Sequence, residues 1–284
     1  MRGNNDQKVV EWRGWLDWIA SLPGGKAWLD HLEKISPNGV TDKKELKDWM
    51  EHQRNAASKE DKKWWNLIPD KWVLFSDHYK VARDMSAAEF QYLLDLPLRL
   101  YVPSAHVFIV HAGLLASDPR YPYDDKRQPL ARLPKLMATD ADTPKLNKTR
   151  NELESLRRLQ DLSLLTLIPQ NLIPWNVLNI RSVKNGEVFK KFGKGRTPWS
   201  DLWNLEMNRC IGYNQELPHD PVDGDSAAIY GRKKDALPCY PSTIVYGHAA
   251  AHGLDLKRWS IGLDSGCVSA FFKLLNSSER TFAV

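Results

Sequence analysis

The sequence predicts an α/β fold in which helices come first and the strands of a mixed β-sheet follow. Apolar residues recur with a helical period across residues 9–97. Runs of β-branched and aromatic residues come next, as in "LRLYVPSAHVFIV" at 98–110 and "STIVYGH" at 242–248. Polar motifs stand where these runs end, and strand ends are where α/β proteins bind ligands. We therefore expect a sheet with helices packed on it and a site at its edge.

Residues 9–97 carry two signals for helix starts and one for a buried helix face. Asp42 and Ser86 precede helical patterns and are typical N-cap residues. Trp12, Trp15 and Trp18 recur about every third residue, which places them on one side of a helix. Such a stripe more often packs a core than stacks on nucleic-acid bases, so we expect these tryptophans to be buried. The helices should cover one side of the sheet.

The middle of the chain predicts a strand pair followed by a long excursion. Residues 98–110 contain two strands joined tightly at Pro103 and Ser104, and His111 follows the second strand. Residues 116–148 are rich in proline and charge without periodicity, which indicates a surface loop or lid. A helical pattern returns at 149–168.

The last third alternates further strands with one short helix. We expect a helix or turn at 197–206, where the sequence reads "TPWSDLWNLE". The predicted strands are "WNVLNIRSV" (175–183), "GEVFKK" (186–191), "STIVYGH" (242–248), "WSIGLD" (259–264) and "SAFFKLL" (269–275). No internal repeat is evident, and residues 1–284 are expected to form a single domain.

Composition excludes several classes of protein. A balance of 40 basic and 35 acidic residues is too even for a dedicated nucleic-acid binder. No apolar run reaches the roughly 18 residues of a membrane span, and the N-terminus lacks a signal-peptide core, so a cytoplasmic location is expected for the chain as written. Cys210, Cys239 and Cys267 form no C-x-x-C pair, which favours reduced, structural thiols.

Two histidines follow apolar strands beside glycines that allow close backbone approach. They are His111 in "VHAG" and His248 in "YGH". Either one alone is more often a hydrogen-bonded structural residue than a metal ligand. His248 and His252 are four residues apart, the spacing of a helical metal pair. Glycines bracket them and no glutamate follows the first histidine, which excludes a helical H-E-x-x-H site.

Five segments, in this order along the chain, resemble the calcineurin-like metallophosphoesterases. The resemblance is to the branch that holds serine/threonine phosphatases and symmetrical diadenosine tetraphosphate hydrolases, and the segments are most similar to the fungal zinc-dependent endopolyphosphatases. They are "RGNND" (2–6), "VHAG" (110–113), "PWNVLNIRSV" (174–183), "GKGRTPWSDLWN" (193–204) and "VYGHAAAHGLDL" with "GLDSGCV" (245–268). The resemblance implies a metallophosphoesterase-type mixed sheet flanked by helices, here without the first β-α-β portion, because the family's first two motifs would precede residue 1.

The resemblance also implies hydrolysis assisted by two metal ions. Asn4, His111 and His248 would hold one of these ions, which could be zinc, manganese, iron or cobalt. Three neutral ligands without a carboxylate leave the charge of a divalent ion largely uncompensated, so weak metal binding is expected. The implied partner is a phosphorylated small molecule or inorganic polyphosphate, and polyphosphate or a dinucleoside polyphosphate is preferred as the substrate over a phosphoprotein. Arg181 is the predicted phosphate contact, because a guanidinium grips two oxygens.

Departures from the family pattern support an alternative reading. Asn5 takes the place of the general-acid histidine, and an amide cannot donate a proton as an acid. Ala249 and His252 stand where the endopolyphosphatases commonly have Asp and Arg, although a protonated His252 could reach an anion. The alternative is a catalytically inactive remnant that binds phosphate, or a partner through an exposed sheet edge. A targeting segment lost from the N-terminus would make the location vacuolar.

Basic residues gather in two stretches. A solvated loop face is the more frequent meaning of such clusters, and steering of an anionic substrate is the alternative. The clusters are Arg181, Lys184, Lys190, Lys191, Lys194 and Arg196, and then Arg232, Lys233 and Lys234.

Overall fold

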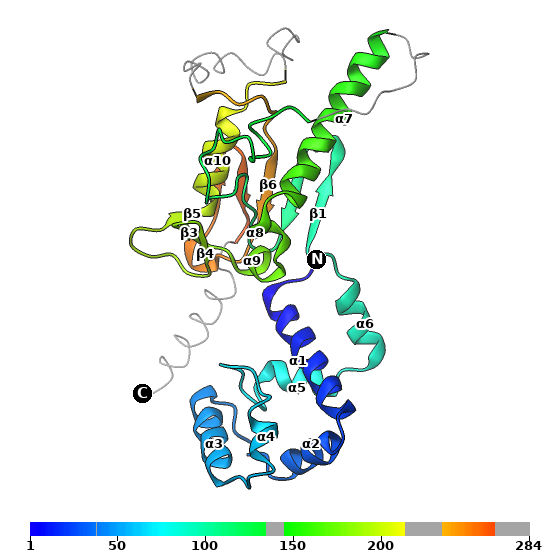
Figure 1. Ribbon diagram of the computed structural model, residues 1–284, viewed down its shortest axis with the longest axis vertical. Helices are drawn as coiled ribbons and strands as arrows, with labels where there is room; N and C mark the ends of the chain where they lie inside the picture. The colour runs from blue at the N-terminus through cyan, green and yellow to red at the C-terminus, as the bar shows by residue number, and fades with distance from the viewer. Residues whose placement is uncertain (38, 135–144, 214–234, 265–284) are drawn as a thin grey trace, which may run out of the picture. The chain divides into compact units, whose positions relative to one another are not determined.

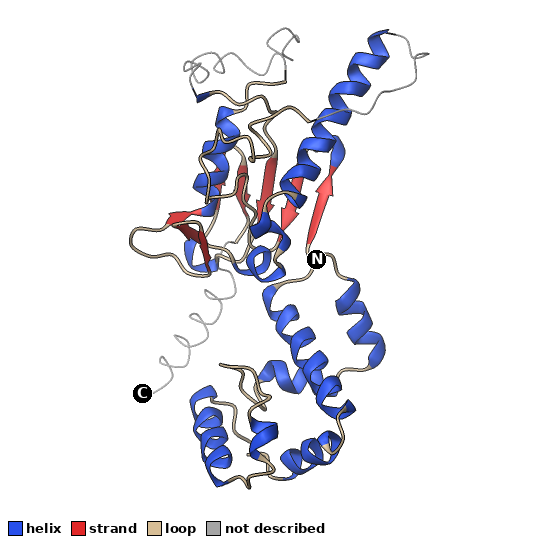
Figure 2. Cartoon of the chain, viewed as in Figure 1, coloured by secondary structure: helices blue, strands red, loops and turns tan. Residues whose placement is uncertain are grey.

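A computed structural model describes residues 1–37, 39–134, 145–213 and 235–264. By its internal contacts the chain divides into two compact units, residues 2–97 and residues 98–284 with Met1. Figure 2 shows the described strands in the second unit, whereas the first is built from helices and loops. That residues 1–284 form a single domain stays a prediction. That the helices of residues 9–97 cover one side of the sheet stays a prediction as well.

The first unit is helical, as its sequence period predicts (Figure 1). Its helices are α1 (Asn4–Ser21), α2 (Gly25–Lys34), α3 (Lys43–Ala56), α4 (Lys62–Trp65), α5 (Asp77–Asp84) and α6 (Ala87–Asp95). Both predicted N-caps are confirmed. The Asp42 carboxylate accepts from the backbone N–H groups of Lys44 and Glu45 at the start of α3. Ser86 and Glu89 form a reciprocal capping box at the start of α6.

The tryptophan stripe on α1 is buried at two of its three positions. Trp12 and Trp15 are 4% and 6% exposed, and the Trp15 indole N–H donates to the Leu67 carbonyl at 2.9 Å. Trp18 is 46% exposed, so the prediction of burial was wrong there. Successive helical residues turn by about 100°, and a spacing of three therefore drifts by about 60° at each step until Trp18 leaves the core face.

A five-stranded mixed sheet lies in the second unit, in the order β1-β2-β6-β8-β7. The central pairs β2–β6 and β6–β8 are parallel, and the outer pairs β1–β2 and β7–β8 are antiparallel. The strands are β1 (Arg99–Val102), β2 (Val107–Val110), β6 (Thr243–Tyr246), β7 (Asp255–Lys257) and β8 (Ser260–Gly262). The prediction of a mixed sheet in an α/β protein is confirmed. The three-residue strand β7 was not predicted, because so short a run carries no clear period.

Helices and a second, small sheet accompany the main sheet (Figure 1). The helices are α7 (Lys145–Thr166), α8 (Pro169–Leu172), α9 (Pro174–Asn179) and α10 (Trp199–Arg209), with single 3-10 turns at Pro103–Ala105 (η1) and Ala250–His252 (η3). The small antiparallel sheet has the order β4-β3-β5 and consists of β3 (Ser182–Lys184), β4 (Glu187–Phe189) and β5 (Thr197–Pro198). The core joins sheet and helices: Phe108 of β2 meets Trp203 of α10 with ring centroids 5.9 Å apart.

The structure corrects the strand predicted over residues 175–183. Most of this segment is helix α9, which begins at Pro174, and only its last two residues belong to β3. Proline at the first helical position lacks an N–H that would be unpaired there and has the φ that a helix needs, so it favours the helix start. In the predicted excursion at 116–148, residues 116–134 form turns without a helix or strand, and 145–148 already belong to α7. Residues 135–144 and the strand predicted at 269–275 lie outside the described residues.

A disulfide joins Cys210 to Cys239, so the expectation of reduced thiols was wrong for this pair. The backbone brings the two cysteines together after α10 ends. The N–H of Ile211 donates to the Leu237 carbonyl at 3.1 Å, and that of Gly212 to the Cys239 carbonyl at 2.9 Å. This pairing leaves the two Cα atoms 4.7 Å apart, within the range that a disulfide spans. Cys267 lies outside the described residues.

Among the residues that the structure describes, no helix combines the length and apolarity needed to cross a bilayer.

Candidate functional site

Two parallel neighbouring strands bring His111 and His248 to one edge of the main sheet. His111 directly follows β2, and His248 comes two residues after β6. The N–H of Gly247 donates to the His111 carbonyl at 3.0 Å, which continues the pairing beyond the strands. Parallel strands end at the same edge, so residues 137 positions apart in the chain become neighbours. The predicted placement of both histidines at strand ends is confirmed.

The two imidazole rings face each other at short range. His111 Nε2 lies 3.2 Å from His248 Nδ1, and the ring centroids are 4.9 Å apart. Both side chains are half-buried. His248 has a φ of 69°, a left-handed conformation that residues other than glycine adopt rarely and at some cost. The fold therefore holds the His248 peptide in an unusual conformation beside the ring of His111.

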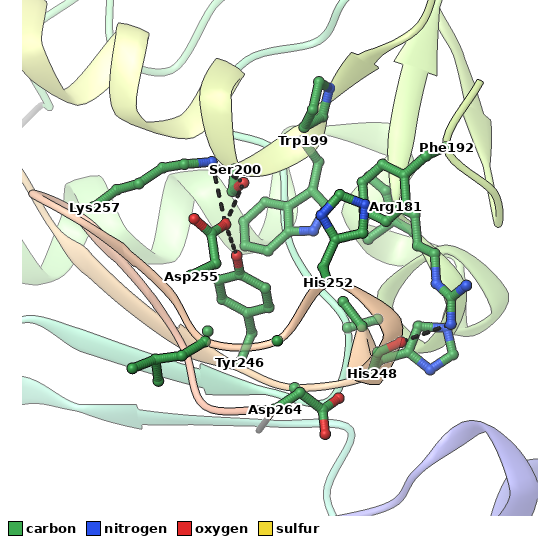
Figure 3. Close-up of a pocket in the computed structure, with 18 residues that line it drawn as sticks. Arg181, Phe192, Trp199, Ser200, Tyr246, His248, His252, Asp255, Lys257 and Asp264 are labelled. Carbon is green, nitrogen blue, oxygen red and sulfur yellow. Dashed lines mark hydrogen bonds and ion pairs between the residues drawn. The ribbon is translucent and has the colours of Figure 1, made fainter. Parts of the chain in front are cut away.

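Arg181 is one of the groups that hold this peptide. Its Nη2 donates to the His248 carbonyl at 2.7 Å (Figure 3). Arg181 stands between α9 and β3, so its predicted position at the end of a long strand was wrong. Its Nε is buried and has no hydrogen-bond partner among the described residues. The contact of Arg181 with a phosphate stays a prediction.

A pocket of about 240 Å³ opens next to His248 and Arg181. Phe192, Trp199 and His252 are among the residues that line it (Figure 3). His252 is exposed and ends the 3-10 turn η3, with its ring centroid 3.9 Å from that of Phe192. It shares no α-helix with His248, as the bracketing glycines predict. A contact between His252 and an anion stays a prediction.

The far end of the pocket carries a compact polar cluster. Lys257 Nζ donates to Ser200 Oγ and to Asp201 Oδ1, both at 2.7 Å, and lies 3.2 Å from Asp255 Oδ2. The hydroxyl of Tyr246 donates to Asp255. Burial alone would raise the pKa of Asp255, but the hydrogen bonds from Tyr246 and Lys257 hold it below its ordinary value. Lys257 thus has two carboxylate partners, Asp201 and Asp255.

Sequence reasoning did not find this polar cluster. Ser200 and Asp255 lie within two of the segments quoted for the resemblance, but neither was singled out there, and Lys257 lies outside these segments. Asp255 and Lys257 belong to β7. They meet Ser200 only because β7 pairs with β8 near the first turn of α10. No local signal in the sequence reveals that arrangement.

Asn4 and Asn5 begin helix α1 in the unit of residues 2–97. The side chain of Asn5 accepts from Lys8 Nζ at 3.1 Å and lies 3.3 Å from His78 Nε2. Burial and then the nearby Lys8 lower the pKa of His78. Sequence reasoning missed His78, which comes from α5 and stands in no motif. Because Asn4 belongs to the other unit, its place beside His111 and His248 stays a prediction.

The remaining residues of the R-G-N motif have structural roles. Arg2 Nε donates to the Leu93 carbonyl at 3.1 Å and its Nη2 to the Leu94 carbonyl, which ties the end of α6 to the start of α1. The Asp6 carboxylate accepts from the Gly3 N–H at 2.8 Å and so caps the first turn of α1.

The donor atoms fit a divalent metal ion in part. Two imidazole nitrogens that converge at 3.2 Å are suitable donors for zinc and similar borderline ions. A stable protein site commonly has three or four ligands. Within the described ranges, no three His, Cys, Asp or Glu side chains are grouped to hold an ion. The histidine pair thus supplies half of such a site.

The fold and the site define an α/β protein with a histidine pair at one edge of a mixed sheet. Comparison with known protein families gave no match, and no curated protein matches the sequence. Among solved structures, one described as "Crystal structure of a putative diadenosine tetraphosphatase" is similar at 19% identity and a TM-score of 0.31. The similar region covers 68% of this chain and 51% of that one, so this chain spans about half its length. A likeness this slight carries no conclusion about function.

Proposed function

We propose that this chain is a divalent-metal-dependent hydrolase of phosphoanhydride bonds, with inorganic polyphosphate or a dinucleoside polyphosphate as its substrate. The observation that carries the proposal is the approach of His111 Nε2 to His248 Nδ1 at 3.2 Å. The two imidazoles follow neighbouring strands, His248 has an unusual backbone conformation, and imidazole nitrogens suit a borderline metal ion. The resemblance of the ordered motifs to the metallophosphoesterases supports the same reaction class.

In this proposal each residue has a stated role. His111 and His248 would bind the ion. A bound divalent ion polarises phosphoryl oxygens and so assists attack on phosphorus. Arg181 orients His248 through the His248 carbonyl and contacts the phosphate in the pocket, while His252, which also lines the pocket, meets a second phosphate.

A second candidate function is phosphate binding without turnover. Asn5 favours it, because a side-chain amide cannot protonate a leaving group. The number of ligands favours it as well, because a site with only two protein ligands binds a metal ion weakly. The same pocket would then retain a phosphate without cleaving its bond.

The metal site can be tested separately from turnover. Zinc titrated into the purified chain in a calorimeter should bind, and His111→Ala and His248→Ala should each weaken binding by about tenfold or more, since even residues that only support metal ligands contribute that much. His252→Ala is the matched control, four residues from His248, and should bind zinc as the wild type does. Equal binding by all four proteins would contradict the proposal.

Turnover then separates the two candidate functions. Release of phosphate from polyphosphate and from diadenosine tetraphosphate is measured with zinc, manganese or cobalt. A metal-dependent rate that disappears in His248→Ala supports the hydrolase. Zinc and phosphate binding without measurable release supports the non-catalytic alternative.

A further inference from the structure

One strongly positive segment has basic residues for which the candidate pocket gives no role. It is formed by residues 181–196, which run from Arg181 through β3 and β4 to the residue before β5, and which we name the cationic hairpin. The segment has six basic residues and a single acidic one, Glu187. The basic residues are Arg181, Lys184, Lys190, Lys191, Lys194 and Arg196. The four lysines are exposed to solvent.

Within the part of the chain that the structure describes, no ion pair compensates the positive charges of the cationic hairpin. None of the ion pairs among the described residues includes any of its six basic side chains. The two guanidiniums donate to backbone carbonyls instead, Arg181 to His248 and Arg196 to Lys191. Lys257, in the same pocket, differs because it pairs with Asp201 and Asp255. The cationic hairpin therefore presents a field that attracts anions.

The backbone beneath these charges is held by hydrogen bonds. Asn185 and Gly186 have φ of 51° and 82°, the pair of positive values that a tight two-residue hairpin turn requires. After β4, the Lys191 carbonyl accepts from Ser182 Oγ at 2.7 Å and from Arg196 Nη1 at 3.2 Å. A surface ordered before binding loses little entropy when it takes up a ligand.

The cationic hairpin borders the candidate pocket. Arg181 and Phe192 belong to the hairpin and line the pocket at the same time (Figure 3). A chain of phosphates with one group beside Arg181 would continue over Lys190, Lys191 and Lys194. The pocket alone is too small for a long chain, whereas the lysines outside it offer charge for further phosphates.

We propose that the cationic hairpin is an exosite for linear inorganic polyphosphate, which binds the part of the chain that lies outside the pocket. The proposal rests on the proposed function in that the pocket receives the phosphate that reacts. Single-stranded nucleic acid carries similar charge, but its binding commonly depends on bases stacking on aromatic rings. In the hairpin, Arg196 lies 3.9 Å over the Phe189 ring, and His252 packs against Phe192 at 3.9 Å. Both phenylalanine rings of the hairpin are therefore already in contact with other side chains and are less open to stacking bases, which favours a polyanion without bases.

The test measures binding of end-labelled long-chain polyphosphate by fluorescence anisotropy, in EDTA so that no metal-dependent turnover occurs. Replacing Lys190, Lys191 and Lys194 together by Gln should weaken long-chain binding by about tenfold and reduce the slope of log K against log salt by about 2, because three charges are removed. Affinity for tripolyphosphate should change by less than about twofold, since a short chain does not extend over the hairpin.

The matched control replaces Lys43, Lys44 and Lys47 on α3 by Gln, which removes the same charge from equally exposed positions. This control should bind long-chain polyphosphate as the wild type does. An equal loss in both triple variants would show that net charge alone attracts the ligand and would overturn the exosite. Binding of polyuridylate RNA as tight as that of polyphosphate would also overturn it, in favour of a nucleic-acid surface.

Failure of the exosite and failure of the proposed function give different results in this test. His248→Ala should lose zinc binding and keep long-chain binding in EDTA. If the hairpin variant binds like the wild type while metal-dependent hydrolysis is present, the exosite alone is wrong.

Discussion

At the scale of single residues, Gly113 shows how tightly the chain after His111 packs against the pocket wall. A Cβ built on Gly113 would lie 2.3 Å from Cε2 of Trp199. Trp199 is 3% exposed and lines the pocket, so its ring has little room to move away. Glycine is needed here because of a close side-chain approach and not because of its backbone dihedrals.

Gly113→Ala should therefore destabilise the unit of residues 98–284 by about 1–3 kcal/mol, the usual cost of overpacking a well-packed core. Urea denaturation measures the change. Gly193→Ala is the control, because a Cβ there meets Arg196 Cδ at an ordinary 3.5 Å. Equal stability of the two variants would show that the Trp199 side chain can shift to make room for the added methyl group.

The histidine pair shows what the sequence reveals about a site at this scale. Each histidine could be found from its position after an apolar strand. Their mutual contact could not, because it depends on β2 and β6 being parallel neighbours across 137 residues of chain. The contacts among Ser200, Asp255 and Lys257 could not be predicted either, since no local pattern reveals which side chains a fold will bring together.

At the scale of elements, helix α6 depends on its N-terminal cap more than α5 does. Ser86 Oγ accepts from the Glu89 N–H, and the Glu89 carboxylate accepts from the Ser86 N–H, which lowers the pKa of Glu89. Ser76 occupies the same position before α5 and makes no side-chain cap hydrogen bond. Two similar serines thus provide a matched comparison.

Ser86→Ala should cost about 1 kcal/mol of stability, because the Glu89 N–H loses the hydroxyl that accepts from it and the Glu89 carboxylate loses one of its two donors. Ser76→Ala should cost much less. Denaturant unfolding of the two variants, monitored by circular dichroism, gives the difference. Equal losses would show that the capping box contributes nothing beyond the ordinary preference for serine.

The elements also show where sequence patterns mislead. Asp42 and Ser86 were recognisable because capping is local chemistry. The segment 175–183 looked like a strand because most of its apolar residues are β-branched or aromatic, yet the proline that precedes it begins helix α9. A short apolar run packs as well in a helix as in a strand, and only the flanking residue distinguishes them.

At the scale of the whole molecule, the two units have separate hydrophobic cores. One core consists of residues between Val9 and Ala82 and the other of residues between Phe108 and Tyr246. The disulfide between Cys210 and Cys239 belongs to the second unit alone. Its contribution to stability should therefore be confined to that unit.

Reduction of this disulfide, or Cys239→Ser, should destabilise residues 98–284 by about 3–4 kcal/mol, the loop-closure value for a separation of 29 residues. The unit of residues 2–97 should keep its stability. Hydrogen exchange followed by mass spectrometry, with and without reductant, resolves the two units. Increased exchange in both units to the same degree would contradict this assignment.

The same disulfide has a consequence for proteolysis. A peptide bond cut anywhere between Cys210 and Cys239 would leave two fragments that remain one covalent molecule. The fragment with β6, β7, β8 and His248 would stay attached to the fragment with β2 and His111. Such a nicked protein would migrate as the intact chain on a denaturing gel without reductant, and would separate into two bands once reductant is added.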